Sequence, residues 1–135
     1  MIDSPERPVV VCVDDDASIL SALRRTFRQE PFEFLATEDA TEALDWVLLR
    51  KARIVLADQR MPVVTGLEFL DLVKACSPST IRIMITGQSD LTGILKRKKL
   101  ESIQKLIRKP WDDAQLKAVL RGLLFPAGVP LPETS

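Results

Sequence analysis

Histidine is absent from all 135 residues of this sequence. Its absence excludes sites that use histidine as a catalytic base, such as the Ser-His-Asp triad, and the usual zinc sites that contain histidine. The two cysteines, Cys12 and Cys76, are too few and too far apart in the sequence for a disulfide framework or a zinc knuckle. Any chemistry must therefore depend on carboxylates, lysine and hydroxyl groups.

Excess charge of one sign and long hydrophobic runs are missing as well. The 19 basic and 19 acidic residues leave a formal net charge of zero, so no overall field attracts nucleic acid or an anionic membrane. No apolar run is long enough to span a bilayer, and the polar, proline-containing residues 1–8 lack the apolar core of a signal peptide. We therefore expect a cytoplasmic protein without a membrane partner.

The composition that remains is typical of a folded globular domain. Hydrophobic residues make up 46% of the chain and charged residues 28%, and the length suits one domain with a sizeable core. The polar start predicts a flexible leader over residues 1–8. We expect one domain over residues 9–125, followed by an irregular, proline-containing tail or linker over 126–135.

Short apolar runs alternate with helical patterns five times along the chain. Unbroken runs of β-branched and other apolar residues are typical of strands buried on both faces of a parallel sheet. The predicted strands are 9–13, 32–36, 54–57, 81–85 and 104–108. The predicted helices begin at Ala17, near Ala43, near Leu67, at Leu91 (to Leu100) and after Asp112. This alternation with short connections predicts a doubly wound α/β fold with helices on both faces of the sheet.

Polar side chains stand at four of the five strand ends, at Asp14, Asp15, Asp58, Thr86 and Lys109. The carboxyl ends of parallel strands open on one side of a sheet, so these groups are expected to share a crevice. Acids separated by roughly 4–5 Å repel each other by on the order of 1 to 4 kcal/mol per pair, and cations must offset this cost. Lys109 supplies one cation, and a divalent ion with oxygen ligands, Mg²⁺ or Mn²⁺ in its place, supplies the other.

Asp58 is the candidate nucleophile of this crevice. With a metal ion bound, its carboxylate is able to attack phosphorus and form an acyl phosphate. Phosphoryl transfer requires little beyond in-line placement and neutralisation of the phosphoryl oxygens, for which Mg²⁺, Lys109 and the Thr86 hydroxyl are suited. The simpler interpretation is that Asp58 only begins a turn.

Several motifs, taken together and in order, resemble the receiver domain of bacterial two-component response regulators. They are Val13-Asp14-Asp15-Asp16, Leu56-Ala57-Asp58-Gln59-Arg60-Met61-Pro62, Gly66, Thr86-Gly87 and Lys109-Pro110-Trp111. Each motif alone is weak, but the ordered set covers roughly residues 8–125. The resemblance implies a flavodoxin-like (CheY-like) sheet of five parallel strands in the order 2-1-3-4-5, with five helices.

The resemblance also implies a role for each group. Asp58 would accept a phosphoryl group from a histidine kinase or a phosphotransfer protein, and Thr86 and Lys109 would contact that group. The Lys109–Pro110 peptide bond would be cis. Mg²⁺ would be held by three carboxylates and one backbone carbonyl, those of Asp14, Asp15, Asp58 and Arg60. The chain would then be a signalling domain that catalyses only its own phosphorylation and dephosphorylation.

The sequence departs from the family at Leu106, where an aromatic residue usually stands three positions before the lysine. Thr86 would still move towards the phosphoryl group and change the face formed by the fourth helix, fifth strand and fifth helix. This face would contact an output domain, a protein partner or, in a homodimer, a second copy. Leu106 predicts a weaker or differently transmitted switch. Arg60 and Gln88, two residues beyond Asp58 and Thr86, are expected to set the lifetime of the phosphoryl group.

Two further features each have two interpretations. Asp16 either caps the first helix, which we favour, or helps to hold the metal ion. The basic run Lys96-Arg97-Lys98-Lys99, with Lys105 and Arg108 near it, is either a solvated helix face or a partner-docking surface. Direct nucleic-acid binding is disfavoured because the run lacks interleaved aromatic residues.

Two other functions remain open. A haloacid dehalogenase-type phosphohydrolase would use Asp14 as its nucleophile, since residues 14–18 loosely resemble the Asp-x-Asp-x-Thr motif of that family. That family also carries a later acidic pair at a strand end, and its mechanism has no role for an acid at the position of Asp58. A pseudo-receiver would be an interaction module that never accepts a phosphoryl group.

Overall fold

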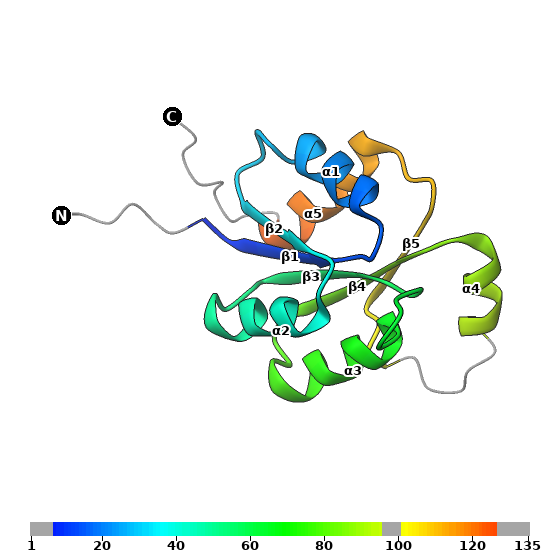
Figure 1. The fold of residues 1–135 in the computed structure, drawn as a ribbon. Coiled ribbons are helices and arrows are strands. Elements are labelled where there is room, and N and C mark those ends of the chain that lie inside the picture. Colours follow the sequence, from blue (N-terminus) through cyan, green and yellow to red (C-terminus); the bar gives the residue numbers. More distant parts are fainter. Residues whose placement is uncertain (1–6, 96–100, 127–135) are drawn as a thin grey trace.

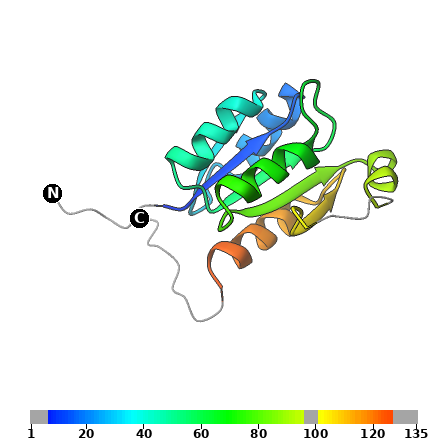
Figure 2. The same cartoon turned by 90° about the horizontal axis from the view of Figure 1, so that it is seen from below.

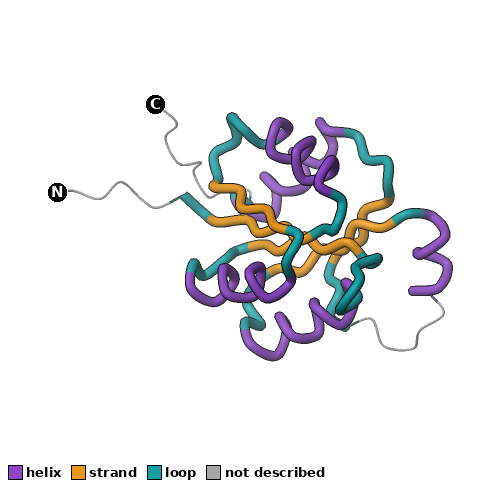
Figure 3. Tube along the Cα trace, viewed as in Figure 1, coloured by secondary structure: helices purple, strands orange, loops and turns teal. Residues whose placement is uncertain are grey.

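A computed structural model of the chain describes residues 7–95 and 101–126 (Figure 1). Its centre is a sheet of five parallel strands, which Figure 3 shows as the layer between the helices. The strands are β1 (Val9–Val13), β2 (Glu33–Thr37), β3 (Ile54–Asp58), β4 (Ile81–Thr86) and β5 (Lys105–Arg108). They lie in the order β2-β1-β3-β4-β5, which confirms the predicted fold class and strand order.

Helices cover both faces of the sheet (Figure 1). One face carries α1 (Ala17–Thr26) and α5 (Asp113–Leu124). The other carries α2 (Ala40–Leu49) and α3 (Gly66–Cys76), which lie side by side in Figure 2, with α4 (Gln88–Leu95) beyond them. Each side has its own apolar core, because successive strand residues point to opposite faces. Val11 of β1 packs with the α2 and α3 residues and Cys12 with the α1 and α5 residues.

Side-chain caps fix where the helices begin. Asp16 accepts a hydrogen bond from the backbone N–H of Ser18 at 2.9 Å and is the N-cap of α1, which confirms the favoured interpretation of this acid. Asp39 and Asp112 cap α2 and α5 in the same way. Thr65 begins α3 with a capping box. Asp16, Asp39 and Asp112 each come two to four residues after a strand end, so the loops before α1, α2 and α5 are short.

Helix α4 differs from the prediction. It begins at Gln88, directly after Gly87, and not at Leu91. Its first turn is polar, so apolar periodicity could not reveal it. The later part of the predicted helix, with the basic run 96–99, lies outside the described residues, as do residues 1–6 of the predicted leader and 127–135 of the tail. No helix within 7–95 and 101–126 has the length and apolar character needed to cross a membrane.

Candidate functional site

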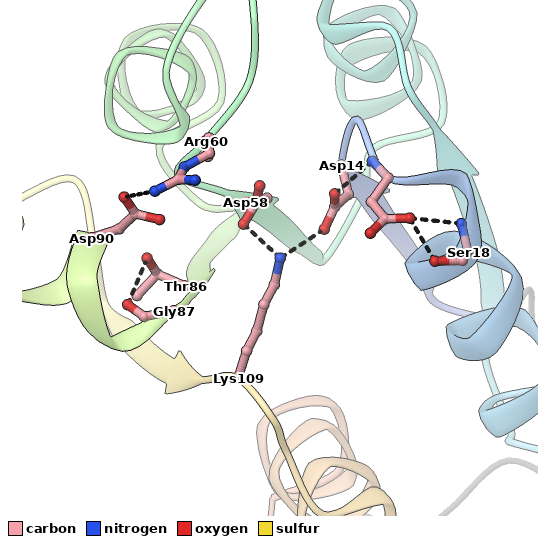
Figure 4. Close-up of polar contacts among 9 residues, drawn as sticks. Asp14, Ser18, Asp58, Arg60, Thr86, Gly87, Asp90 and Lys109 are labelled. Atoms are coloured by element: carbon pink, nitrogen blue, oxygen red, sulfur yellow. Dashed lines mark hydrogen bonds and ion pairs between the residues drawn. The ribbon is translucent and has the colours of Figure 1, made fainter.

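The structure brings the predicted polar groups together at the carboxyl ends of four strands (Figure 4). Asp58 and Thr86 are the last residues of β3 and β4, Asp14 follows β1 and Lys109 follows β5. Oxygens of Asp14, Asp15 and Asp58 all lie within 4.8 Å of one another. The strand order explains this grouping, since β1 and β4 are the two neighbours of β3. Asp16 is not a member of this group of three carboxylates.

Lys109 joins the carboxylates. Its Nζ lies 2.8 Å from Asp58 Oδ1 and 3.4 Å from Asp14 Oδ2. The two acids are nearly inaccessible, with side chains 6% and 3% exposed, whereas Lys109 is 26% exposed. The Lys109 backbone N–H donates to the Thr86 carbonyl at 2.8 Å, and the Lys109–Pro110 peptide bond is cis, the form that the resemblance implies. The Lys109 ammonium group therefore neutralises part of the negative charge of two buried acids.

Burial makes this cluster electrostatically costly. It raises the pKa of Asp14 to about 6, and the charge of Asp58 adds to the effect, although the Asp16 N–H and Lys109 oppose it. Burial also raises the pKa of Asp58, with smaller contributions from the charges of Asp15 and Asp90, against the lowering effect of Lys109. Burial of Lys109 disfavours its charge, but the two carboxylates outweigh that effect and raise the pKa of the amine. The site thus has more negative charge than Lys109 can neutralise.

This donor set fits a hard divalent cation. Three carboxylates supply only oxygen ligands, which Mg²⁺ and Mn²⁺ prefer, and no thiol or imidazole competes. Asp15 is exposed, so the cluster opens to solvent on one side. The Arg60 carbonyl, the fourth ligand that the resemblance implies, belongs to the loop that follows Asp58. A cation at this place would stabilise the buried, ionised carboxylates of Asp14 and Asp58, whose pKa values are raised chiefly by burial.

Gly66 allows the loop after β3 to return closely to Asp58. A Cβ atom at position 66 would lie 2.4 Å from the Asp58 carbonyl oxygen and 2.8 Å from the Gln59 Cα, where no side chain fits. Instead the Gly66 N–H donates to the Gln59 carbonyl, and Gln59 Oε1 accepts from the Leu67 N–H at 2.8 Å. The glycine of the family motif therefore fixes the backbone that carries Asp58.

Thr86 is fully buried, and its hydroxyl donates to the Gly87 carbonyl at 3.5 Å (Figure 4). This distance is at the long end for a hydrogen bond, so the contact with Gly87 holds the hydroxyl only weakly. Leu106, the departure from the family, lies in β5 directly beside β4 and packs half-buried against the core below α3. Gln88 begins α4, but its side chain lies outside the described residues.

Sequence reasoning missed Asp90. This acid, in the first turn of α4, pairs with Arg60, whose Nη2 lies 3.0 Å from Asp90 Oδ1. Asp90 comes 30 residues after Arg60. Neither residue belongs to an apolar pattern, so periodicity could not pair them. The one available signal was the position of an acid shortly after the strand end at Thr86.

Comparisons with known proteins agree on one family. The family model described as "Response regulator receiver domain" matches residues 10–121. The hydrogenase transcriptional regulatory protein HoxA of Cupriavidus necator is 38% identical over 108 residues, which cover 80% of this chain and 22% of that protein. The chain therefore spans only about a fifth of the length of the first curated relatives that it matches.

Solved structures show the same likeness. The signal receiver domain of an HD domain-containing protein from Pseudomonas fluorescens Pf-5 is similar with a TM-score of 0.80 and 31% identity, covering 92% of this chain and 91% of that one. A response regulator receiver domain protein from Clostridium thermocellum is similar with a TM-score of 0.76 and 25% identity, covering 87% and 94%.

Proposed function

Since this chain belongs to the response regulator receiver domain family, we propose that it accepts a phosphoryl group on Asp58 and passes on the signal by changing one of its faces. The chain is thus a receiver domain of two-component signalling. The observation that carries the proposal is the placement of Asp58. Its carboxylate ends a central strand, touches the Lys109 ammonium group at 2.8 Å and lies in one group with Asp14 and Asp15.

The reaction begins with attack of an Asp58 carboxylate oxygen on the phosphorus of a phosphohistidine. The P–O bond to Asp58 forms as the P–N bond breaks, and the leaving imidazole takes a proton from solvent. Lys109 neutralises charge on the phosphoryl oxygens, and the Thr86 hydroxyl turns from Gly87 to donate to one of them. Attack of water on phosphorus later releases inorganic phosphate and restores the carboxylate. The domain so catalyses only its own phosphorylation and dephosphorylation.

Asp14, Asp15 and Asp58, with the Arg60 carbonyl, would hold Mg²⁺ or Mn²⁺. When bound, the ion supplies positive charge for the phosphoryl oxygens as they pass from donor to acceptor. The raised pKa values of Asp14 and Asp58 are consistent with this proposal: they arise chiefly from burial of the two carboxylates, with a smaller contribution from neighbouring acids, and a bound cation would stabilise the ionised forms. Arg60 and Gln88 would govern access of water and hence the lifetime of the phosphoryl group.

The implied partners are a histidine kinase or phosphotransfer protein and an output domain, as in response regulators generally. This exchange would take place in the cytoplasm, where such kinases present their phosphohistidine. A pocket of about 520 Å³ is lined by the apolar residues Ile19, Pro110 and Trp111 and by the charged residues Lys109 and Asp113. We propose that the donor docks there, close to Asp58. An output domain or a protein partner would bind to the α4-β5-α5 face, or two copies of this chain would form a homodimer through it.

The proposal is tested by treatment with acetyl phosphate and Mg²⁺, followed by peptide mapping of the labelled protein. We expect one phosphoryl group, on the peptide that contains Asp58, and its loss when EDTA is present during labelling. A label on Asp14 would instead support a phosphohydrolase of the haloacid dehalogenase type. Absence of any label, with acetyl phosphate and with a phosphorylated kinase domain, would support a pseudo-receiver.

Leu106→Tyr is expected to increase severalfold the change that phosphorylation causes in the hydrogen-exchange rates of the α4-β5-α5 face. Leu106 has no hydroxyl group and packs against the core in the non-phosphorylated structure, so it offers no polar group that could follow Thr86. The measurement is hydrogen exchange of α4 and β5 with and without beryllofluoride, a phosphoryl mimic. Equal changes in the wild-type and Leu106→Tyr proteins would contradict the prediction, and Leu106→Met is the matched control that keeps an apolar chain.

A further inference from the structure

The ion pair between Arg60 and Asp90 connects the loop after Asp58 to the first turn of α4. Arg60 Nη2 lies 3.0 Å from Asp90 Oδ1. In Figure 4 this pair lies beside Asp58, on the side where Thr86 stands and away from Asp14. Arg60, two residues beyond the proposed acceptor Asp58, is thus held by Asp90 on α4, a helix of the α4-β5-α5 face.

The ion pair is exposed to solvent, so Arg60 can exchange Asp90 for another partner at little cost in free energy. The Arg60 side chain is 73% exposed and that of Asp90 26%, and ion pairs so close to water contribute little stability. A phosphoryl group carries about −1.5 to −2 charges near pH 7 and three acceptor oxygens, against a single charge on Asp90. Arginine binds such groups through two parallel N–H donors. A phosphoryl group on Asp58 would therefore compete well for the guanidinium group.

Asp90 itself is close enough to sense the charge at Asp58. Its carboxylate is among the charges that raise the pKa of Asp58. Added negative charge on Asp58 would consequently repel Asp90 while it attracts Arg60. Both effects act on the same ion pair and in the same direction.

The ion pair ties the first turn of α4 to the loop after Asp58. Among the α4 side chains that the structure describes, only Ile94 is buried, and it lies at the far end of the helix. The helix begins two residues after Thr86, so its start also follows any movement of that residue. The aromatic residue that carries the family's switch is replaced by Leu106, and the ion pair offers a different connection between Asp58 and this face.

We propose that Arg60 exchanges partners on phosphorylation, leaving Asp90 for the phosphoryl group, and that loss of the ion pair releases the first turn of α4. The proposal rests on the proposed function, since it needs a phosphoryl group on Asp58. In this chain Arg60 is then a positioning residue for α4 before phosphorylation and a phosphoryl ligand after it.

The test is a double-mutant cycle on Arg60→Gln and Asp90→Asn, with beryllofluoride and Mg²⁺ as the probe. Calorimetry measures the affinity for beryllofluoride. Asp90→Asn is expected to tighten binding roughly two- to fivefold, because Arg60 no longer has a competing partner. In the Arg60→Gln background, Asp90→Asn is expected to raise the affinity for beryllofluoride by a clearly smaller factor, since it then removes only the repulsion by Asp90. Asp45→Asn, which removes an exposed acid of α2, is the matched control and should bind like wild type.

Hydrogen exchange of α4 gives the second measurement. In the wild-type protein beryllofluoride should speed exchange in the first turn of α4, whereas in Arg60→Gln exchange should already be fast without it. An equal effect of Asp90→Asn in both backgrounds, or exchange in α4 that neither Arg60→Gln nor beryllofluoride alters, would overturn the partner exchange alone. Failure of the wild-type protein to bind beryllofluoride at all would overturn the proposed function, and this inference with it.

Discussion

Asp14→Asn is expected to stabilise the metal-free protein by roughly 2 kcal/mol at pH 7. Asp14 is 2% exposed, and its pKa rises from an ordinary value of 3.8 to about 6, chiefly because burial disfavours the carboxylate. A shift of this size corresponds to about 3 kcal/mol of unfavourable free energy in the ionised state, and loss of the contact with Lys109 offsets part of the gain. The melting temperature should rise by roughly 5–8 °C.

The same shift predicts how stability depends on pH. The folded state holds the proton of Asp14 more tightly than the unfolded state does, so this residue stabilises the fold below about pH 4 and loses that contribution as the pH rises through about 6. Asp58 acts in the same direction because its pKa is raised too. The raised pKa of Lys109 matters only at alkaline pH. The metal-free wild-type protein should therefore become less stable between pH 4 and pH 7, and Asp14→Asn should reduce this loss.

Denaturant unfolding in EDTA and in Mg²⁺, at several pH values, measures both effects. Mg²⁺ should stabilise the wild-type protein through binding to the native state and have little effect on Asp14→Asn. Asp16→Asn is the matched control, because asparagine still caps α1 while the charge is lost. The pKa of Asp16 is lowered by its hydrogen bonds to Ser18, so its removal should not stabilise the fold. Equal stabilities of wild type and Asp14→Asn in EDTA would contradict the prediction.

The fold could be predicted from the sequence because its strands are buried on both faces. All residues of β1 and β3 are buried, so each strand is an unbroken apolar run that ends where polar residues begin. A parallel sheet then brings these ends to one side, whatever the details of the loops. This is why the grouping of Asp14, Asp58 and Lys109 followed from their positions in the sequence alone. The first turn of α4 carries no such pattern and was missed.

The ion pairs of long exposed side chains could not be predicted in this way. Arg60 reaches across to Asp90, and Arg121 of α5 reaches the buried carboxylate of Glu30 with two N–H groups at 2.7 and 2.9 Å. A flexible side chain has several acids within reach, and neither the apolar pattern nor the strand order selects one. The centre of the site is therefore set by topology, whereas its connection to the surface depends on individual side-chain contacts that the structure had to supply.

Lys109→Met is expected to slow phosphoryl transfer to Asp58 by roughly 10²- to 10³-fold, the usual cost of removing one charged or hydrogen-bonding group that stabilises a transition state. The Lys109 ammonium group lies 2.8 Å from Asp58. A second carboxylate, that of Asp14, also contacts this ammonium group and helps to hold it in place. Methionine keeps the length of the side chain but cannot neutralise the phosphoryl oxygens. A bound divalent ion would neutralise only part of the same charge, so saturating Mg²⁺ should not restore the rate.

Intact-protein mass spectrometry after mixing with acetyl phosphate at saturating Mg²⁺ measures the rate of labelling. Lys105→Met, four residues earlier at an exposed position of β5, is the matched control and should label at the wild-type rate. Circular dichroism should show that both variants remain folded. A Lys109→Met rate within about threefold of wild type would mean that the ammonium group is not used in the transfer. Its place between two buried acids would then be structural, because its ammonium group contacts both Asp14 and Asp58.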